Sequence, residues 1–399
     1  MQTKTSIKIK PKYLKEYQKG YPLLTHEMSD DWSKVSQEGT LIDLYDWQNN
    51  FVARGYYGRQ NKGYGWVLSN NKRSKIDSEF FTHKIKDAIA YRKAFYQDSN
   101  TTAFRIFNGE GDGVGGVTID YFDGYYLFTW YSLGIYHFHA QIIEALKNSV
   151  EYKGIYQKKR FDQKGQYLDE KDDFICGSKA AEPLIIKENG INFAIYLDDG
   201  PMVGIFLDQR EVRNTIKNEY AQNKTLLNTF SYTGAFSIAA ALGGATKTTS
   251  VDLAKRSLPK TQEHFNINNI NPDVHDIIVE DVFNYFKYAV RKKFLFDIVV
   301  VDPPSFARSK KHTFSVAKDY VKLLKEVISI TQKGGLIVAS TNYANFDLKH
   351  FKGMIDKAFK ALKTPYRIEE TFTLPKDFRV NEKFVQGNYL KVIFVKKLY

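Results

Sequence analysis

The chain has 399 residues, of which 43% are hydrophobic and 15% aromatic, and it carries a formal net charge of +13. This length predicts two or three domains, and no apolar run approaches the roughly 20 residues of a membrane helix. The single cysteine, Cys176, excludes a disulfide framework and a cysteine-based zinc site, and no metal is expected. The basic excess favours a polyanionic partner such as nucleic acid, with small anionic substrates as the alternative.

The N-terminal stretch MQTKTSIKIKPK is polar and basic, so we expect no signal peptide. Together with the lone cysteine, this favours a cytoplasmic protein outside the membrane. Residues 1–80 then contain short alternating runs separated by glycines. These runs predict a small β-rich domain: GTLIDLYD, FVARGYYG and GYGWVLS.

A central α+β domain is predicted for residues 81–196. Apolar residues at helical spacing over residues 81–95 indicate a helix. The stretch FRIFNGEGDGVGGVTIDYF indicates two strands around a glycine-rich turn. Because a strand follows these glycines and no Lys-Ser/Thr pair does, they favour a hairpin turn over a phosphate-binding loop.

Strands and helices alternate over residues 197–399, which predicts a parallel, doubly wound α/β sheet of the Rossmann-like kind. Such sheets bind ligands at the carboxyl ends of their strands, so the residues that follow each strand are the candidates. The predicted strands are TLLNTF, KTTSVDL, VHDIIVED, FDIVVVDPP and GGLIVASTN, with YRIEETFTLP and NYLKVIFVKK at the end.

Four strand ends indicate a site for an adenosine-type cofactor. NTFSYTGAFS, with Gly234, lets the backbone approach a ligand at a helix start. Asp252 follows 18 residues later and suits a ribose diol. Asp281 ends the third strand as a candidate acceptor for an exocyclic amine, and Asp302 ends the fourth, followed by Pro303 and Pro304.

These stretches, in this order, resemble the class I S-adenosylmethionine-dependent methyltransferases of ribosomal RNA. The closer resemblance is to the three-domain group that methylates cytosine C5 in 23S rRNA, with a PUA-type, a central and a catalytic domain. NGEGDGVGGVTIDYF is similar to the central-domain hallmark, and GYPLLTHEMSD resembles a PUA opening. The resemblance implies S-adenosylmethionine as cofactor and domains at 1–80 (PUA-like, RNA-binding), 81–196 and 197–399. FLDQREVR, SVDLAKRSL, VEDVF and DPPSF match the remaining motifs.

The resemblance also implies the residues of the site. Those implied for the cofactor are Phe206, Asp208, Arg210, Phe230, Ser231, Tyr232, Thr233, Gly234, Asp252, Leu253, Ser257, Asp281, Val282 and Asp302. Those expected at the reacting base are Asp302, Pro303, Pro304, Phe306 and Asn342. Phe306 is placed to stack on an extruded base, and Arg308, Lys310 and Lys311 to hold its phosphates. A solvated basic loop is the alternative interpretation of this last group.

One position departs from the cytosine-C5 pattern. That chemistry needs a cysteine thiolate to add to C6, and here the corresponding stretch, ASTNYANF, has Thr341 instead. STNYANF and FSYTG are more similar to a guanine-N7 methyltransferase, whose target atom has its own lone pair. The target atom therefore stays open between cytosine C5 and guanine N7.

The expected partner is ribosomal RNA, either 23S rRNA or a large-subunit assembly intermediate, and a homodimer is one option for the oligomeric state. Two other functions are weighed. An RNA-binding protein with a decayed catalytic domain would not be expected to keep all the acids of the cofactor site. An NAD-dependent oxidoreductase fits Asp252 alone, but the turn that precedes this acid, NTFSYTGAFS, has no GxGxxG fingerprint.

Overall fold

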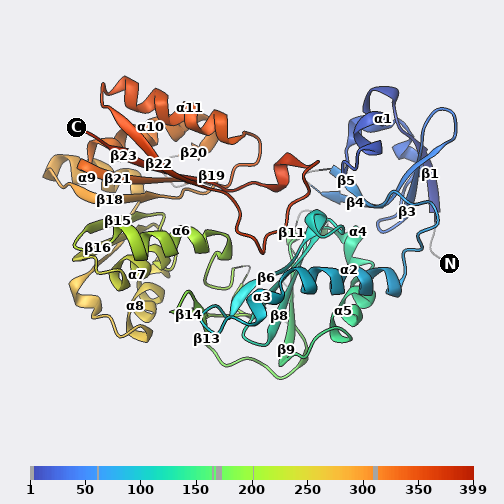
Figure 1. Ribbon diagram of the computed structural model, residues 1–399, viewed down its shortest axis with the longest axis horizontal. Helices are drawn as coiled ribbons and strands as arrows, with labels where there is room; N and C mark the ends of the chain where they lie inside the picture. Colours follow the sequence, from blue (N-terminus) through green and yellow to red (C-terminus); the bar gives the residue numbers. More distant parts are fainter. Residues whose placement is uncertain (1–3, 61–62, 164–165, 168–172, 201, 309–312) are drawn as a thin grey trace. The chain divides into compact units, whose positions relative to one another are not determined.

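The computed structural model describes residues 4–60, 63–163, 166–167, 173–200, 202–308 and 313–399 (Figure 1). The chain forms two compact units, which are described separately below. Unit 1 comprises Met1–Ile186, Ile195–Val203 and Lys376–Gly387. Unit 2 comprises Lys187–Ala194, Gly204–Pro375 and Asn388–Tyr399. The predicted boundaries at residues 80/81 and 196/197 remain predictions.

Unit 1 begins with a five-stranded sheet in the order β1-β3-β4-β5-β2. Its strands are β1 (Lys4–Lys8), β2 (Leu23–Leu24), β3 (Leu41–Tyr45), β4 (Phe51–Gln60) and β5 (Gly63–Ser69). The last three are the predicted strands. The sequence pattern missed β1, which pairs parallel with β3, and helix α1 (Pro11–Gln18), since both are too short to show a clear period. Two 3₁₀ turns, η1 (His26–Met28) and η2 (Asp31–Lys34), complete this part.

A second five-stranded sheet in unit 1 has the order β12-β9-β8-β7-β6. Its strands are β6 (Ala103–Asn108), β7 (Val117–Phe122), β8 (Tyr125–Trp130), β9 (Gly154–Lys159) and β12 (Phe174–Gly177). Strands β6 and β7 are antiparallel, so the glycine-rich stretch between them is a hairpin connection, as predicted. The 3₁₀ turn η3 (Gly109–Gly111) begins it, and β10 (Asp162–Gln163) and β11 (Gln166–Tyr167) form a separate pair.

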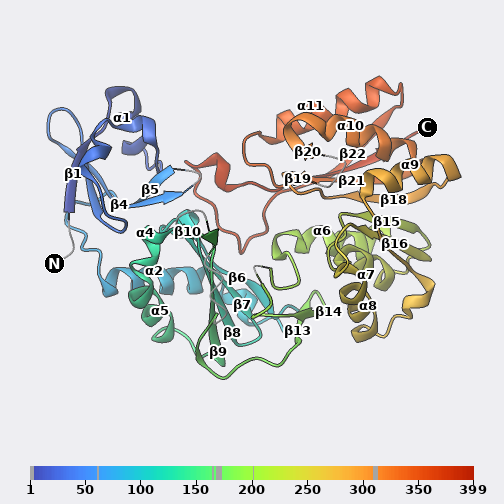
Figure 2. The same cartoon turned by 180° about the vertical axis from the view of Figure 1, so that it is seen from behind.

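Two amphipathic helices cover this second sheet (Figure 2). Phe81, Ile85 and Ala88 of α2 share one core with Ile142 and Leu146 of α5. That same core includes buried residues of β3, β4 and β5, so the two sheets of unit 1 share a hydrophobic cluster. The helices of this region are α2 (Ser78–Tyr91), α3 (Lys93–Tyr96), α4 (Leu133–Tyr136) and α5 (His139–Lys147).

A segment from late in the sequence completes unit 1. Arg92 is fully buried and donates from Nε and Nη2 to the backbone oxygen of Asp377, at 2.9 and 2.7 Å. The same guanidinium group pairs with Asp112 at 2.8 Å. Phe384 joins the shared core and contacts the ring of Trp66 edge-on. Residues 376–387 therefore pack as part of unit 1, although they lie between the last two strands of unit 2 in sequence.

Unit 2 contains a seven-stranded sheet in the order β17-β16-β15-β18-β21-β23-β22. Its strands are β15 (Thr225–Thr229), β16 (Lys247–Asp252), β17 (Asp276–Val279), β18 (Phe296–Val301), β21 (Thr331–Thr341), β22 (Tyr366–Phe372) and β23 (Lys391–Lys397). The first five are parallel, which confirms the doubly wound α/β sheet. The chain order reverses at β15, which lies between β16 and β18, and this is the switch point where such sheets bind ligands.

The sheet is mixed, because β23 runs antiparallel to both β21 and β22. A parallel neighbour needs a crossover, usually a helix. The connection from β22 to β23, residues 373–390, contains a 3₁₀ turn, η7 (Val385–Gly387), as its one helical element. The prediction of a wholly parallel sheet was therefore wrong for the last strand.

Helices cover both faces of this sheet (Figure 1). Val299 and Val301 of β18 pack with α9, α10 and α11 on one face, and Ile298 and Val300 pack with α6 and α7 on the other. Burial on both faces explains the continuous β-branched run of this strand. The helices are α6 (Arg210–Thr215), α7 (Ala235–Leu242), α8 (Ser257–Ile267), α9 (Val282–Lys292), α10 (Val316–Ser329) and α11 (Leu348–Ala361).

Short elements complete the structure. They are β13 (Leu184–Glu188), β14 (Ile191–Ile195), β19 (Phe306–Arg308), β20 (Thr313–Ser315), η4 (Leu207–Gln209), η5 (Ile216–Tyr220) and η6 (Pro272–Val274). Over the described residues, no helix combines the length and the apolar character needed to cross a membrane.

Candidate active site

The predicted site residues follow the strands of unit 2 at one edge of the sheet. The loop 230–234 follows β15, Asp252 ends β16, Asp281 follows β17 and Asp302 follows β18. Asn342 comes directly after β21. Because these five strands are parallel neighbours, their carboxyl ends meet at the same edge, where the sequence pattern placed a ligand site.

The loop after β15 has an unusual backbone. Phe230, Tyr232 and Gly234 all have positive φ, at 55°, 52° and 77°. Two of the three are bulky aromatics, for which this left-handed conformation is uncommon and costs about 1–3 kcal/mol each. At Gly234 a Cβ atom would lie 2.4 Å from the side chain of Thr261, so a glycine is required. Such local strain is typical of ligand-binding loops.

Asp252 holds this loop against the end of β16. Its Oδ2 accepts a hydrogen bond from the backbone N–H of Tyr232 at 2.9 Å, and its Oδ1 accepts from that of Ala254 at 2.8 Å. Each oxygen keeps a further lone pair, so the carboxylate can still accept from a ribose diol. The next residue, Leu253, exposes its side chain and offers an apolar surface beside this carboxylate.

Unpartnered hydroxyl groups lie in the same region. The side chains of Ser231 and Ser257 are buried, and neither hydroxyl has a hydrogen-bond partner among the described residues. A buried polar group without a partner is costly, and a bound ligand is one way to satisfy it. Thr233, by contrast, donates from Oγ1 to the backbone oxygen of Gly204 at 2.7 Å. These residues therefore fit a polar ligand such as an adenosine-type cofactor.

Asp281 has a structural contact that the sequence analysis did not foresee. Its Oδ1 accepts from the backbone N–H of Phe283 at 2.9 Å and thereby caps the N-terminus of α9. Val282, the first residue of this helix, is buried. The cap fixes the carboxylate at the edge of the sheet, while its second oxygen accepts no hydrogen bond within the described residues and can accept one from an amine.

Asp302 is held in a network of side-chain hydrogen bonds. Ser340 donates from Oγ to Oδ1 at 2.6 Å, and Gln209 donates from Nε2 to Oδ2 at 3.2 Å and to Ser340 Oγ at 2.9 Å. Burial raises the pKa of Asp302 to about 6, and the nearby charge of Asp208 adds to this, whereas Ser340, Arg213 and Gln209 oppose it. The carboxyl group is thus kept at the end of β18 with a proton affinity closer to neutral pH.

The FLDQREVR stretch spans η4 and the start of α6. Arg213 forms a buried two-point ion pair with Glu188 at 2.7 and 2.8 Å and donates to the backbone oxygen of Phe206 at 2.7 Å. The ring of Phe206 is exposed and lies 5.4 Å from that of Tyr232. Asp208 accepts a hydrogen bond from the hydroxyl of Tyr389 at 2.9 Å. Arg210 is buried, with its Nε 3.3 Å from Glu211.

The end of β21 is fixed by two further side chains. Ser305 donates from Oγ to Oδ1 of Asn342 at 2.6 Å, which leaves the amide nitrogen of Asn342 to face other groups. Lys391 is buried and donates from Nζ to the backbone oxygens of Tyr343 and Tyr389, both at 2.8 Å. Burial lowers the pKa of Lys391 to about 8, because its charge is removed from water.

Thr341 and Cys176 are the two candidate nucleophiles for a covalent mechanism. Thr341 is fully buried, and its Oγ1 accepts from the backbone N–H of Tyr343 at 3.2 Å. Among the described residues, no basic side chain forms a hydrogen bond with this hydroxyl. Cys176 lies in β12 of unit 1, where it is half-buried and packs against the shared core. Neither group has the partners of an activated nucleophile.

The DPPSF loop leads into a hairpin of β19 and β20. Pro303 is buried and Pro304 is exposed, and Phe306 at the start of β19 is 62% exposed. Arg308 ends β19 in the backbone, while Lys310 and Lys311 lie outside the described residues. The expectation that these three basic residues hold phosphates is therefore still a prediction.

Comparisons with known proteins identify the family. The sequence profile of the S-adenosylmethionine-dependent methyltransferases matches residues 114–376, more than half of the chain. The chain belongs to this family. A PUA-like domain profile matches residues 7–70. The family match decides in favour of S-adenosylmethionine over NAD, a choice that Asp252 alone left open.

Two curated relatives and two solved structures support the assignment of this chain to the methyltransferase family. YwbD of Bacillus subtilis (strain 168) is 54% identical over 393 residues, which cover 98% of this chain and 99% of YwbD, and bears a provisional name as a ribosomal RNA large subunit methyltransferase. Ribosomal RNA large subunit methyltransferase I of Aliivibrio fischeri is 28% identical, covering 88% of this chain and 89% of its own. The structure of SMU.776 complexed with SAH is 40% identical, with a TM-score of 0.90 over 99% of this chain and 100% of that one. A second structure, from Streptococcus mutans, is 39% identical, with a TM-score of 0.89 over 98% and 99% of the two chains.

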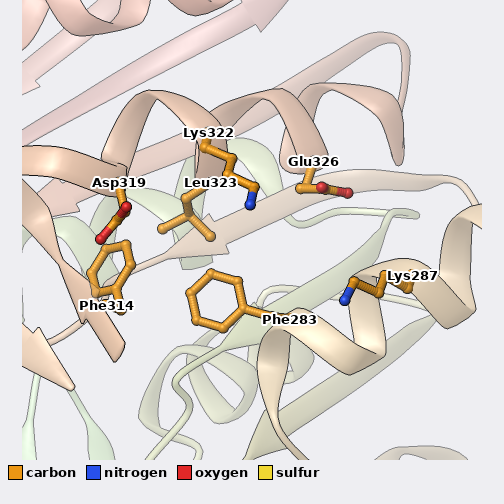
Figure 3. Close-up of a pocket in the computed structure, with 7 residues that line it drawn as sticks. All are labelled: Phe283, Lys287, Phe314, Asp319, Lys322, Leu323 and Glu326. Carbon is orange, nitrogen blue, oxygen red and sulfur yellow. The ribbon is translucent and has the colours of Figure 1, made fainter. Parts of the chain in front are cut away.

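An aromatic cluster connects the loop 230–234 of the methyltransferase with the hairpin of β19 and β20. The ring of Phe314 in β20 lies 5.6 Å from that of Phe283 and 6.4 Å from that of Phe230. Phe283 and Phe314 also line a pocket between α9 and α10, into which Leu323 points (Figure 3). Four charged side chains line this pocket as well, and no residue predicted for the cofactor is among them. The pocket lining is Phe283, Lys287, Phe314, Asp319, Lys322, Leu323 and Glu326.

Proposed function

We propose that the methyltransferase transfers a methyl group to a ring nitrogen of a base in large-subunit ribosomal RNA, without a covalent enzyme–base intermediate. The RNA is supported by the names of the relatives, YwbD among them. The ring nitrogen is supported by one structural observation: the residue at the cysteine position, Thr341, is a buried hydroxyl engaged with the backbone of its own loop. Among ring nitrogens, guanine N7 agrees with the motif resemblance.

The residues at the strand ends fit the cofactor. Asp252 would accept from the ribose hydroxyls, and the backbone of the loop 230–234 would approach the ligand closely because its left-handed residues turn the chain there. Asp281 would accept from the adenine amine and Leu253 would cover the base. S-Adenosylmethionine, when bound, supplies a methyl group on a positively charged sulfur, which any nucleophile with a free lone pair can attack.

The substrate side needs orientation more than activation. A guanine presents N7 and O6 as adjacent acceptors. Because Ser305 holds the oxygen of Asn342, the amide nitrogen can donate to O6 and align N7 for in-line attack. Phe306, which is 62% exposed, can stack on the extruded base. Holding two reactants in this geometry and excluding water can supply most of the rate.

The proposal is tested by mapping modified nucleosides by mass spectrometry in large-subunit RNA from a deletion strain, its parent and a complemented strain. We expect one base methylated on a ring nitrogen to disappear on deletion and to return on complementation. Loss of a 5-methylcytosine instead would contradict the ring nitrogen while leaving the RNA substrate intact. No change in large-subunit RNA would contradict the substrate.

The absence of a covalent intermediate has its own test with the purified protein. Cys176→Ser should retain methyl transfer within about twofold of the wild-type rate, because that thiol packs against the core of unit 1. RNA containing 5-fluorocytosine should form no adduct that survives denaturing gel electrophoresis. An adduct, or loss of activity in Cys176→Ser with an unchanged melting temperature, would return cytosine C5 as the target.

A further inference from the structure

One aromatic side chain of the N-terminal sheet projects into solvent. Trp47 lies in the turn between β3 and β4 and is 59% exposed. The chain has four tryptophans, and the other three, Trp32, Trp66 and Trp130, are 9%, 2% and 0% exposed. A tryptophan gains most from burial and is usually highly buried. Its display at a turn therefore points to an interaction surface.

The turn that carries Trp47 is rigid. Oδ1 of Asp46 accepts from the backbone N–H groups of Gln48 and Asn50 at 2.9 and 2.8 Å, and Oδ2 accepts from the side-chain amide of Asn50 at 3.0 Å. Asn49 has a φ of 64°, which closes the turn. These hydrogen bonds lower the pKa of Asp46, with Asn50 as the main cause. The indole is thus presented by a fixed backbone, which reduces the entropy lost on binding.

Cations lie beside the aromatic rings of this turn. Nζ of Lys8, in the neighbouring strand β1, lies 5.4 Å from the centre of the Trp47 ring. Nζ of Lys72 lies 5.9 Å from the ring of Tyr45, two residues before Trp47. Within the described part of the chain, neither lysine forms an ion pair, so both charges are available to an anion.

The acidic groups nearby are already engaged. Asp43 forms a two-point ion pair with Arg54 at 2.6 and 2.8 Å, and Asp46 is used by its own turn. The surface formed by Lys8, Tyr45, Trp47 and Lys72 thus combines aromatic faces with two lysines that form no ion pair within the described residues, although the charges of Asp46 and Asp31 act on Lys8 from nearby. Unpaired nucleic acid is the ligand that matches both, since its bases stack on aromatic rings and its phosphates pair with lysines.

We propose that the surface formed by Lys8, Tyr45, Trp47 and Lys72 binds a single-stranded segment of the RNA substrate, with one base stacked on Trp47. The proposal rests on the proposed function, which supplies the RNA. It names unpaired RNA because a base inside a duplex does not offer its face to a protruding indole. Binding there is expected to be tolerant of sequence, since every base has a stacking face.

Tryptophan fluorescence reports directly on this surface, because Trp47 is the exposed one of four. Acrylamide should quench Trp47 in the free protein, and saturation with a mixed-sequence single-stranded RNA of about 12 nucleotides should protect it. The same RNA as a duplex should protect it much less. Unchanged quenching at saturating single-stranded RNA would overturn the proposal.

Affinity measurements with matched variants complete the test. Trp47→Ala should weaken binding of the single strand by about tenfold or more, and Trp47→Phe should recover most of the loss. Tyr91→Ala is the control: this ring is 51% exposed, but the two arginines beside it, Arg92 and Arg379, face Asp112. Equal loss in Tyr91→Ala, or no loss in Trp47→Ala, would refute a specific role for Trp47.

Failure of the proposed RNA-binding surface can be distinguished from failure of the proposed function. If the wild-type protein methylates ribosomal RNA and Trp47 stays accessible to acrylamide in the complex, the surface proposal fails alone. If RNA protects Trp47 but no base is methylated, the surface proposal stands and the proposed function fails.

Discussion

The carboxyl group of Asp302 combines burial with two hydrogen-bond donors, Ser340 and Gln209. Its pKa, about 6, lies above the ordinary 3.8, so the folded state binds a proton more tightly than the unfolded chain. The stability contributed by this group therefore increases as the pH falls through 6. Above pH 6, keeping the carboxylate ionised costs folding free energy.

Asp302→Asn should lower the methyl-transfer activity without lowering the stability of the fold at pH 7. We expect methyl transfer to fall by about 100-fold, as for loss of a placed polar group in an active site. At pH 7 the melting temperature should be unchanged or higher, with a gain of at most about 3 kcal/mol in unfolding free energy. At pH 5 the gain should shrink, because Asp302 of the wild type is then protonated. Thermal unfolding at both pH values checks this, and a variant equally destabilised at pH 7 and pH 5 would contradict it.

Asp252 holds the loop after β15 in addition to the ligand-binding role proposed for it. Asp252→Ala should weaken S-adenosylmethionine binding by about 1.5–3 kcal/mol, or roughly 10- to 150-fold, measured by calorimetry. Asp276→Ala is the matched control, since this acid begins β17 at the opposite end of the strands and pairs with Lys247. Equal affinity in the two variants would remove Asp252 from the cofactor site.

Much of the candidate site could be predicted at the level of single residues. Carboxylates and glycines that directly follow a predicted strand can be located from the sequence alone. Gln209, Ser340 and Tyr389 could not. Gln209 lies within the FLDQREVR stretch but shows its role only through a hydrogen bond to Asp302, 93 positions away. Tyr389 reaches Asp208 across 181 positions. Contacts over such sequence distances leave no local pattern.

The hairpin β19–β20 packs against the loop 230–234 and the start of α9. Phe314 pairs with Ala307 in its register and is buried against Phe283 and Phe230. This packing anchors the strand that begins with the exposed Phe306. The position of Phe306, the aromatic proposed to stack on the base, thus depends on a core residue eight positions further along.

Phe314→Leu should therefore affect catalysis more than stability. We expect a loss of up to about 1.5 kcal/mol in unfolding free energy, as for similar-sized core substitutions, with methyl transfer to RNA reduced about tenfold. Phe359→Leu, in the same core but beside Tyr366, should cost similar stability and leave the rate unchanged. Similar rates for the two variants would show that the hairpin does not depend on Phe314.

Regular elements of unit 2 could be predicted because both sequence periods are strong there. β18 shows a continuous β-branched run, and α10 places apolar residues at helical spacing. The helix α6 and its continuation η5 were missed, since they follow a loop and form six- and five-residue pieces. Strand direction was wrong for β23 because direction depends on the connection between strands, which a residue pattern does not encode.

At the scale of the whole molecule, the net charge of +13 gives a prediction that no single residue does. RNA affinity should fall steeply with salt, by about 10³-fold between 50 and 200 mM if six or more phosphates are contacted. S-Adenosylmethionine affinity, which does not depend on a row of phosphates, should change little over the same range. A shallow salt dependence for RNA would mean that few phosphates are bound.

The segment 376–387 also determines when unit 1 can finish folding. During synthesis, N-terminal domains usually fold as they emerge from the ribosome. Here the buried guanidinium of Arg92 receives its backbone acceptor from Asp377, and the shared core receives Phe384, only after residues 204–375 of unit 2 have been made. Until then the nascent chain carries an open core and an arginine without this acceptor. Closure of the core of unit 1 therefore has to wait until most of unit 2 has been synthesised.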